Sequence, residues 1–392
     1  MEYAEQMESP TPDISVVLPA LNEEKTIAEC ITKIKTVFSD LGIYGEIIIA
    51  DSSTDRTPEI AASLGAVIVH PEQMGYGNAY LTGFAHARGR YIAIGDADDT
   101  YDFRELPQLL HKLDDGADLV MGSRLRGEIK SGAMPTLHRY IGNPVLTWLL
   151  NRLFGTTISD AHCGLRVIRR DALERLNLKT GGMEFASEMV IEAAKAGLRI
   201  DEVPITYAAR VMPSKLSTFQ DGWRHVRFML LYRPVPFIAV PGLFFAIFGF
   251  SLMAFFLWQG EIETSRLHSF ILAALAFIGG LHILLMGIMI GVYGAIHGYS
   301  TTNGIITKLM NYYSLERELF LGILLMIAGV VIGLFIVLDW IAAGFGEISQ
   351  IANAVWSLAL FLSGMQITFS AIFISMMLLR YERSEEDVEG EK

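Results

Sequence analysis

The stretch YIAIGDADDTYD, residues 91–102, decides the fold class of the N-terminal half of the chain. Its apolar run Tyr91–Gly95 has the length and composition of a buried strand, and acids follow it directly. Similar runs and stretches with helical spacing alternate before it, at Ile14–Pro19, Lys25–Leu41, Glu46–Ala50, Pro58–Leu64, Ala66–His70 and Gly77–Arg88. Strands that alternate with helices in this order predict an α/β domain whose largely parallel sheet is covered on both faces.

The C-terminal half is much more apolar and predicts an all-α membrane domain. A helix that spans a bilayer needs about 20 mostly apolar residues. Four segments meet this requirement without a single Asp, Glu, Lys or Arg: Val235–Trp258, Leu267–Ile296, Leu319–Leu338 and Ile348–Leu379. Buried helices of a soluble protein rarely stay free of charge for so long, so we expect four transmembrane helices.

The basic residues beside these spans predict their orientation. Most of them lie before the first span, between the second and third, or after the fourth: Arg224, Arg227, Arg233, Lys308, Arg317, Arg380 and Arg383. The other two loops contain only Arg266. Because basic residues concentrate on the cytoplasmic side, the α/β domain and the C-terminus are predicted to be cytoplasmic. The polar start, Met1–Asp13, has no apolar core and is not expected to be a signal peptide.

The domain boundaries follow from these patterns. We expect a flexible N-terminus (1–13), an α/β domain (14–216), an amphipathic juxtamembrane helix (217–234), the transmembrane domain (235–380) and an acidic cytoplasmic tail (381–392). Within the α/β domain, residues 137–154 combine Trp, Leu and Phe with Arg and His. Such a helix lies in the membrane interface or packs against a core, and both readings stay open.

Net charge and cysteine content argue against two classes of protein. A net charge of −12 argues against a general nucleic-acid-binding protein, which usually has a basic excess. The two cysteines, Cys30 and Cys163, are too few for a disulfide framework.

Acids and amides follow three of the predicted strands: Asn22-Glu23-Glu24, Asp51-Ser52-Ser53-Thr54-Asp55 and Asp96-Ala97-Asp98-Asp99. Each set alone is explained by helix N-capping. Together they lie along one edge of one sheet, where ligands of α/β proteins bind. Mg²⁺ and Mn²⁺ prefer oxygen ligands and are often completed by substrate phosphates. Asp96 and Asp98 are therefore candidate ligands of a divalent ion that neutralises a departing nucleotide diphosphate.

Several motifs in a fixed order resemble one family: VVLPALNEEKTI, IIIADSSTDRTPEIA, GYGNAYLTGFAHARGRYIAIGDADDTYD, MGSRL, SDAHCGLRVIRR and VPITYAARVMPSKLS. They resemble family 2 glycosyltransferases of the Rossmann-like GT-A fold, over about Ile14 to Tyr232. Within that family they look most like the dolichol-phosphate and polyprenol-phosphate hexose synthases. The resemblance implies an inverting hexose transfer, with Mg²⁺ or Mn²⁺, from a nucleotide-sugar to a polyprenyl or dolichyl phosphate.

The resemblance also implies roles for individual residues. Nucleotide-binding positions would be Pro19, Asn22, Glu23, Asp51, Asp96 and Ala97, and metal ligands would be Asp96 and Asp98, with Asp98 the direct one. Arg124 and Arg139 match basic positions that hold the lipid phosphate in relatives, although each is equally typical of a surface salt bridge. Asp160 matches an acid near the acceptor, where it orients or deprotonates the acceptor or caps a turn. Arg210 and Lys215 lie in a segment that resembles a flap over the diphosphate.

Two departures from the family pattern concern the donor. Relatives often have an aromatic residue where this chain has Leu21, and Gln where it has Thr100. The first departure affects base recognition and the second affects the metal shell. The departure at Leu21 favours a UDP-hexose donor such as UDP-glucose, with GDP-mannose a close second. A general base is not needed, because the second pKa of a phosphate monoester is about 6.

Two other functions stay open as alternatives. A processive polysaccharide synthase would carry Gln-X-X-Arg-Trp near the first span, whereas residues 220–224 read QDGWR. A non-catalytic sugar-sensing subunit or a flippase would be expected to lose the acid cluster. Membrane lipid is an expected partner and a homo-oligomer is left open.

Two remaining patterns have weaker functional readings. A zinc site at His162-Cys163 is disfavoured, because no second Cys or His lies at ligand spacing. Glu184 and Glu188 are one helical turn apart and face either the site or solvent.

Overall fold

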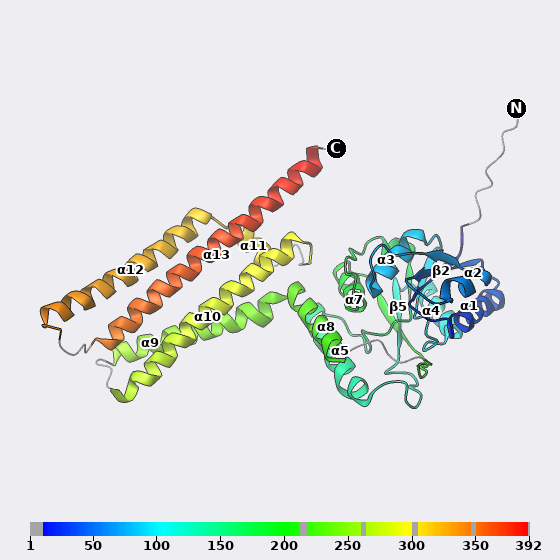
Figure 1. The fold of residues 1–392 in the computed structure, drawn as a ribbon, viewed down its shortest axis with the longest axis horizontal. Coiled ribbons are helices and arrows are strands. Elements are labelled where there is room, and N and C mark those ends of the chain that lie inside the picture. Colours follow the sequence, from blue (N-terminus) through cyan, green and yellow to red (C-terminus); the bar gives the residue numbers. More distant parts are fainter. Residues whose placement is uncertain (1–10, 212–217, 260–263, 300–304, 346–349, 391–392) are drawn as a thin grey trace. The chain divides into compact units, whose positions relative to one another are not determined.

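The structure is a computed structural model that describes residues 11–211, 218–259, 264–299, 305–345 and 350–390 (Figure 1). The chain divides into two compact units, Met1–Phe228 and Met229–Lys392, which are described separately. Most of the expected N-terminal segment 1–13, and Lys215, lie outside the described residues. The domain boundaries expected from the sequence stay a prediction.

The first unit is built on a seven-stranded sheet. Its strands are β1 (Ile14–Ala20), β2 (Gly45–Asp51), β3 (Val67–Val69), β4 (Tyr91–Ile94), β5 (Leu119–Ser123), β6 (Arg166–Arg169) and β7 (Ile200–Pro204). Their spatial order is β3-β2-β1-β4-β6-β5-β7, and β6 runs antiparallel to both of its neighbours while the other pairs are parallel. The expected α/β class with a mostly parallel sheet is confirmed.

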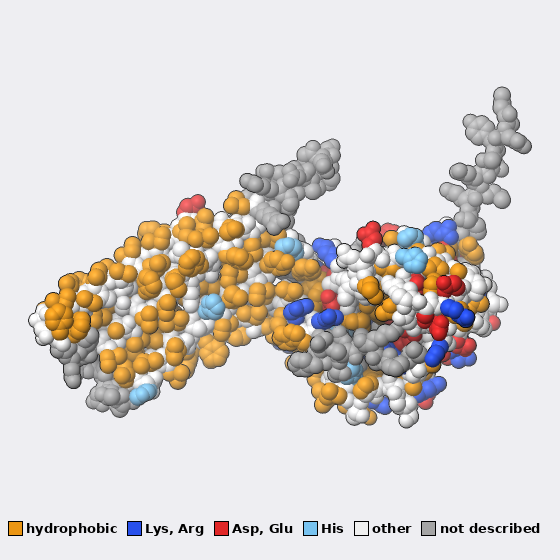
Figure 2. Space-filling model, viewed as in Figure 1, with side chains coloured by type: hydrophobic (Ala, Val, Ile, Leu, Met, Phe, Trp, Pro, Cys, Tyr) orange, Lys and Arg blue, Asp and Glu red, His pale blue; other side chains and the backbone are white. Residues whose placement is uncertain are grey.

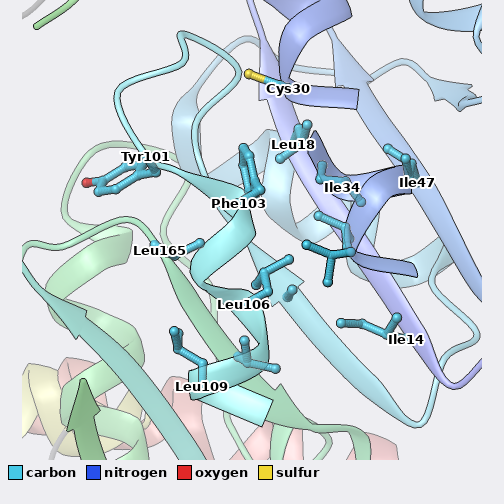
Figure 3. Packing of buried hydrophobic residues seen from close by; sticks show 14 of the residues in the cluster. Ile14, Leu18, Cys30, Ile34, Ile47, Tyr101, Phe103, Leu106, Leu109 and Leu165 are labelled. Carbon is cyan, nitrogen blue, oxygen red and sulfur yellow. The ribbon is translucent and has the colours of Figure 1, made fainter. Parts of the chain in front are cut away.

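Helices cover both faces of the sheet. The helices in this part of the chain are α1 (Ile27–Leu41), α2 (Thr57–Ser63), α3 (Tyr76–His86), α4 (Leu106–Asp114), α5 (Asn143–Phe154), α6 (Arg170–Leu173), α7 (Phe185–Lys195) and α8 (Thr218–Tyr232), with the short η1 (Phe103–Glu105) and η2 (His138–Gly142). Not all of them pack on the sheet. On one face Leu18, Ile34 and Leu106 join strand and helix side chains in one buried cluster (Figure 3). On the other face α3 approaches β1 so closely that a Cβ at Gly83 would overlap Val17.

The register brings the chemically interesting loops to one edge of the sheet. Ala20 pairs with Asp51, and Ile94 pairs with both Val17 and Arg166. The loops after β1, β2 and β4, and the loop before β6, therefore emerge at the same edge. The chain leaves β1 for β2 on one side and returns to β4 on the other, which makes β1/β4 the switch point where α/β sheets bind ligands.

The second unit consists of long apolar helices. After the short η3 (Val235–Ala239) come α9 (Val240–Trp258), α10 (Thr264–Ile296), α11 (Ile305–Asn311), α12 (Leu315–Ala342) and α13 (Ile351–Gly390). Among the described residues four stretches are long and apolar enough to span a membrane: Val235–Trp258, Arg266–Ile296, Leu315–Ala342 and Ile351–Leu379. The four predicted spans are confirmed, although the expected start of the fourth, at Ile348, lies outside the described residues. The third extends beyond the expected Leu319–Leu338, because its helix continues through charged residues at both ends.

Hydrophobic side chains cover the visible surface of these helices, whereas charged side chains gather on the α/β unit (Figure 2). Such a surface is stable in lipid and not in water. The chain is a membrane protein.

Small residues allow these helices to pack closely. A Cβ at Gly280 of α10 would lie 2.2 Å from the backbone nitrogen of Ala246 on α9. A Cβ at Gly364 of α13 would lie 2.4 Å from the carbonyl oxygen of Gly322 on α12. Helices in membranes associate through such close backbone approaches, because lipid offers no hydrophobic driving force between helices.

The segment 137–154 forms η2 and α5 and carries an exposed apolar surface. Tyr140, Ile141 and Trp148 are 66%, 57% and 64% exposed, whereas Leu150 is fully buried on the opposite side. These exposed side chains lie outside the core of their own unit. An interfacial position for this segment stays a prediction, and the exposed surface supports it.

Candidate active site

The loops after β1 and β2 are joined by Asn22. Its backbone is left-handed (φ 56°), a conformation that Asn adopts more readily than most residues. Its N–H donates to Ser53 Oγ at 2.8 Å, and its Oδ1 accepts from the N–H of Thr54 at 2.8 Å. The next residue, Glu23, donates its N–H to Thr57 Oγ1 at 2.8 Å. The predicted nucleotide-binding residues of these two loops therefore form one rigid wall at the sheet edge, with Pro19 beside Ala50 just behind it.

Asp51, the last residue of β2, has an unused acceptor in this wall. The side chain is buried, and Oδ2 accepts from the N–H of Ser53 at 3.2 Å. Oδ1 is buried with no hydrogen-bond partner among the described residues. A buried carboxylate oxygen without a donor costs about 1–3 kcal/mol or more. A ligand N–H or O–H would remove that cost.

Asp96 follows β4 and lies beside a group of aromatic side chains. Oδ1 accepts from the hydroxyl of Tyr76 at 3.0 Å, and the Tyr76 ring packs edge-on against Tyr80. Burial, followed by the charge of Asp98, raises the pKa of Asp96 to about 6. The sequence gives no signal for Tyr76 as a partner of Asp96, since the two residues meet only through the packing of α3 on the sheet.

The raised pKa of Asp96 predicts a pH effect on the metal-free protein. The carboxyl of Asp96 holds its proton more tightly in the folded than in the unfolded state. Its protonation therefore stabilises the fold at low pH. This contribution to the free energy of unfolding is lost as pH rises from about 4 to about 6. Asp96→Asn should abolish this dependence and raise the unfolding free energy above pH 6, by up to about 3 kcal/mol. Denaturation of both proteins in a chelator, at pH 4.5 and 7.5, measures it; equal pH slopes would contradict the prediction.

Asp98 is buried, and both of its oxygens have partners in the first unit. Oδ1 accepts from the hydroxyl of Thr100 at 2.6 Å and from its N–H at 3.1 Å. Oδ2 pairs with Arg210 Nε at 2.7 Å. Between the two acids, the carbonyl of Ala97 accepts from Thr26 Oγ1 at 2.9 Å, which fixes the turn to the start of α1. Thr100, where relatives often have Gln, therefore orients the carboxylate of Asp98.

Asp96 and Asp98 fit a divalent cation. Mg²⁺ and Mn²⁺ are commonly held by one or two carboxylates plus substrate phosphates. Asp98 already holds a cationic side chain on Oδ2, and the charge of Asp98 raises the pKa of Asp96. Among the described residues no three His, Cys, Asp or Glu side chains form a potential metal group.

Arg124 and Asp160 are each other's partner. Arg124 Nε and Nη2 donate to Oδ2 and Oδ1 of Asp160 at 2.7 and 2.8 Å, and the N–H of Arg124 adds a bond at 3.1 Å. Asp160 is 0% exposed and Arg124 is 7% exposed. The Arg124 guanidinium also lies over the ring of Tyr207, 5.1 Å from its centre. The predicted roles of both residues stay predictions, and any phosphate that binds Arg124 shares it with Asp160.

Two side chains that the sequence analysis did not single out hold this loop in place. Glu202 accepts from the N–H groups of Ser159 and Asp160 at 2.8 and 3.1 Å. Arg166, buried at the start of β6, donates to the carbonyl oxygens of Ala161, Cys163 and Ala186 at 2.8–2.9 Å. A buried arginine with three backbone acceptors is structural. Only its place in a charged run, RVIRR, marks it in the sequence, and such a run is more typical of the surface.

His162 and Glu188 have structural partners. Ser187 Oγ lies 2.8 Å from His225 Nδ1 and 3.3 Å from His162 Nε2. Burial, and then His225, lower the pKa of His162 well below its usual value, so the ring is neutral. Glu188 is fully buried and accepts from the N–H groups of Lys179 and Thr180.

Arg139 lies on η2, with its guanidinium 5.4 Å from the ring centre of Tyr140.

Comparisons with known proteins identify the family to which this chain belongs. The family described as glycosyl transferase family 2 matches residues 15–176, and the family 2 C-terminal transmembrane region matches residues 288–378. The low-salt glycan biosynthesis hexosyltransferase Agl6 of Haloferax volcanii is 43% identical over 372 residues, which are 93% of this chain and 89% of that protein. A dolichyl-phosphate hexose transferase of the same organism is 34% identical over 54% of this chain and 89% of its own length. Among solved structures, glucosyl-3-phosphoglycerate synthase from Mycobacterium tuberculosis, in complex with Mn²⁺ and UDP, is 26% identical with a TM-score of 0.46, over 56% of this chain and 79% of that one.

The GT-A sheet, its acid-lined edge and the four membrane helices define a membrane-embedded glycosyltransferase. The chain belongs to glycosyl transferase family 2.

Proposed function

We propose that this enzyme transfers one hexose from a nucleotide-sugar to the phosphate of a polyprenyl or dolichyl phosphate, with inversion at the anomeric carbon. The observation that carries the proposal is the pair Asp96 and Asp98, which directly follows β4 at the switch point of the sheet. The two Haloferax relatives are named for hexosyl transfer, and one of them for transfer involving dolichyl phosphate.

The nucleoside would lie against the wall formed by Pro19, Asn22, Glu23 and Asp51. The buried Oδ1 of Asp51 has no partner among the described residues, which suits a donor group on a base or ribose. Ala97 and Asp96 would line the ribose side. A uridine nucleotide is the favoured donor and a guanosine nucleotide the second choice, because Leu21 stands where relatives often have an aromatic residue.

A divalent ion, Mg²⁺ or Mn²⁺, would be held by Asp98 and Asp96 and would supply charge neutralisation for the leaving diphosphate. Asp98 is aimed by two hydrogen bonds from Thr100. Arg210, which contacts Asp98, would add a second positive charge beside the diphosphate. Lys215, the other residue expected in the flap, lies outside the described residues, and its role stays a prediction.

The acceptor phosphate would be held by arginines. Arg139 lies on the segment with the exposed apolar surface of Tyr140, Ile141 and Trp148, which suits a ligand whose tail is in the membrane. Arg124 would add charge while remaining paired with Asp160.

In the reaction a phosphate oxygen of the lipid attacks the anomeric carbon as the bond from that carbon to the diphosphate breaks. No proton has to be removed, because the phosphate monoester is largely ionised at neutral pH. The enzyme's contribution is to align the nucleophile behind the anomeric carbon and to stabilise the charge on the leaving group. Asp160 is therefore proposed to position Arg124 rather than to act as a base.

We also propose that the first unit and the C-terminus are cytoplasmic. Seven of the eight Lys and Arg residues that flank the spans lie on that side. A cytoplasmic site has direct access to nucleotide-sugars.

Radiolabelled donors test the proposal. Full-length protein in detergent is incubated with Mn²⁺ or Mg²⁺, a short polyprenyl phosphate and UDP-glucose, UDP-galactose or GDP-mannose in separate reactions. We expect label from one donor to enter the organic phase and to require the lipid phosphate. Label in the organic phase when polyprenol replaces polyprenyl phosphate, or no lipid label from any donor with a folded preparation, would contradict the proposal.

A further inference from the structure

The contact between Arg210 and Asp98 occupies the oxygen that a metal ion would need. Oδ1 of Asp98 is held from inside by the hydroxyl and N–H of Thr100, at 2.6 and 3.1 Å. Oδ2 is the remaining oxygen, and Arg210 Nε donates to it at 2.7 Å. A divalent ion that binds Oδ2 therefore competes with this guanidinium for the negative charge of Asp98.

The charges explain why the guanidinium lies there. Asp98 is only 8% exposed, and Asp96 adds a second carboxyl beside it. A buried carboxylate without a counter-charge is strongly destabilising. The Arg210 guanidinium removes that destabilisation when no metal ion is bound.

The backbone places Arg210 so that its side chain can move on its own. The N–H of Ala208 donates to the carbonyl of Thr100 at 2.9 Å, and the N–H of Tyr207 donates to Glu128 O at 2.8 Å. These bonds fix the chain two and three residues before Arg210. The guanidinium reaches Asp98 from this fixed point through its flexible stem, so it can leave the carboxylate while the bonds of Tyr207 and Ala208 stay intact.

We propose that Arg210 is a displaceable internal cation: it neutralises Asp98 when no metal ion is bound, and it would pair with the diphosphate of the donor when a divalent ion neutralises Asp98 instead. This rests on the proposed function, since it requires a metal ion on Asp98. Alone, the metal ion weakens the ion pair between Arg210 and Asp98. A nucleotide diphosphate provides a new partner, so the metal ion and the nucleotide bind cooperatively, and each tightens the other by the same factor.

Mn²⁺ binding to the full-length protein tests this without any measurement of turnover. The free Mn²⁺ signal in electron paramagnetic resonance gives the Kd with and without saturating UDP, and with GDP in parallel. Arg210→Gln should bind Mn²⁺ more tightly than wild type when no nucleotide is present, because no ion pair has to be broken. The ratio of the Kd without nucleotide to the Kd with nucleotide should be smaller in Arg210→Gln than in wild type, by roughly tenfold.

Two further variants make the comparison specific. Arg210→Lys keeps a positive charge and should lie between wild type and Arg210→Gln. Arg104→Gln removes an arginine that pairs with Asp102 at the same 2.7 Å but lies on the surface, and it should bind Mn²⁺ as wild type does.

The outcomes separate this inference from the proposed function. If Mn²⁺ binding depends on Asp98 but the Kd ratio of Arg210→Gln equals that of wild type, the inference is wrong and the metal site stands. An Arg210→Gln protein that binds Mn²⁺ more weakly than wild type without nucleotide also overturns it. If no variant binds Mn²⁺ even with nucleotide, the proposed metal site fails and the inference fails with it.

Discussion

Asp98→Asn should lower the turnover of the enzyme by at least about 100- to 1000-fold while leaving the protein folded. The substitution keeps the size of the side chain and its contact with Thr100, but it removes the negative charge that a divalent ion requires. Without that ion the leaving diphosphate loses its main counter-charge in the transition state. Initial rates of label transfer at saturating donor, with the melting temperature of each preparation, measure the effect.

Asp99→Asn is the matched control for this experiment. It makes the same chemical change one residue further along, where the carboxylate pairs with Lys33 Nζ at 2.7 Å. Its left-handed backbone (φ 61°) is one that Asn also adopts readily. Its turnover should stay within about threefold of wild type, as expected for loss of a partly exposed ion pair. Equal losses in the two variants would show that any nearby acid matters and would remove the specific claim for Asp98.

Asp160→Asn should lower the free energy of unfolding by about 3–5 kcal/mol. Asp160 is fully buried and accepts three hydrogen bonds from Arg124, so its neutralisation leaves a buried guanidinium without its counter-charge. Urea unfolding of the full-length protein, followed by tryptophan fluorescence, gives the change. Arg124→Gln should cost a similar amount, and the double variant should cost clearly less than the sum of the two single ones.

Asp201→Asn provides the surface comparison, because Asp201 pairs with Arg199 at 3.0 Å in an exposed position. Its unfolding free energy should change by less than about 1 kcal/mol. If Asp160→Asn kept wild-type stability but lost most of its turnover, Asp160 would have a direct catalytic function, and the positioning role proposed for it would be wrong.

Much of this architecture was predictable from local sequence patterns. Alternation of short apolar runs with helical stretches predicts the strands from β1 to β4, and the charge-free stretches predict the membrane spans. The acids Asp51, Asp96 and Asp98 were predicted to lie along one edge of the sheet, because the carboxyl ends of parallel strands share that edge. The register of β1 with β2 and β4 confirms that placement.

The partners of these acids were not predictable, because they come from distant parts of the chain. Nothing in the MGSRL motif indicates that Arg124 pairs with Asp160, and nothing near Arg210 points to Asp98. The antiparallel β6 was also missed, since its four residues, RVIR, give no sign of direction. Local patterns predict which acids reach the edge of the sheet. The packing of distant segments determines which of these acids pair with an arginine there.

The number of hexoses added to each lipid tests the central claim most directly. Full-length enzyme is incubated with polyprenyl phosphate and an excess of the donor that labels the lipid phase, and the products are analysed by mass spectrometry. We expect a single product, one hexose joined to the lipid through a mild-acid-labile phosphodiester, and none with Asp98→Asn. A ladder of lipids with several hexoses, or a sugar polymer without lipid, would instead identify a processive synthase and contradict the proposed function.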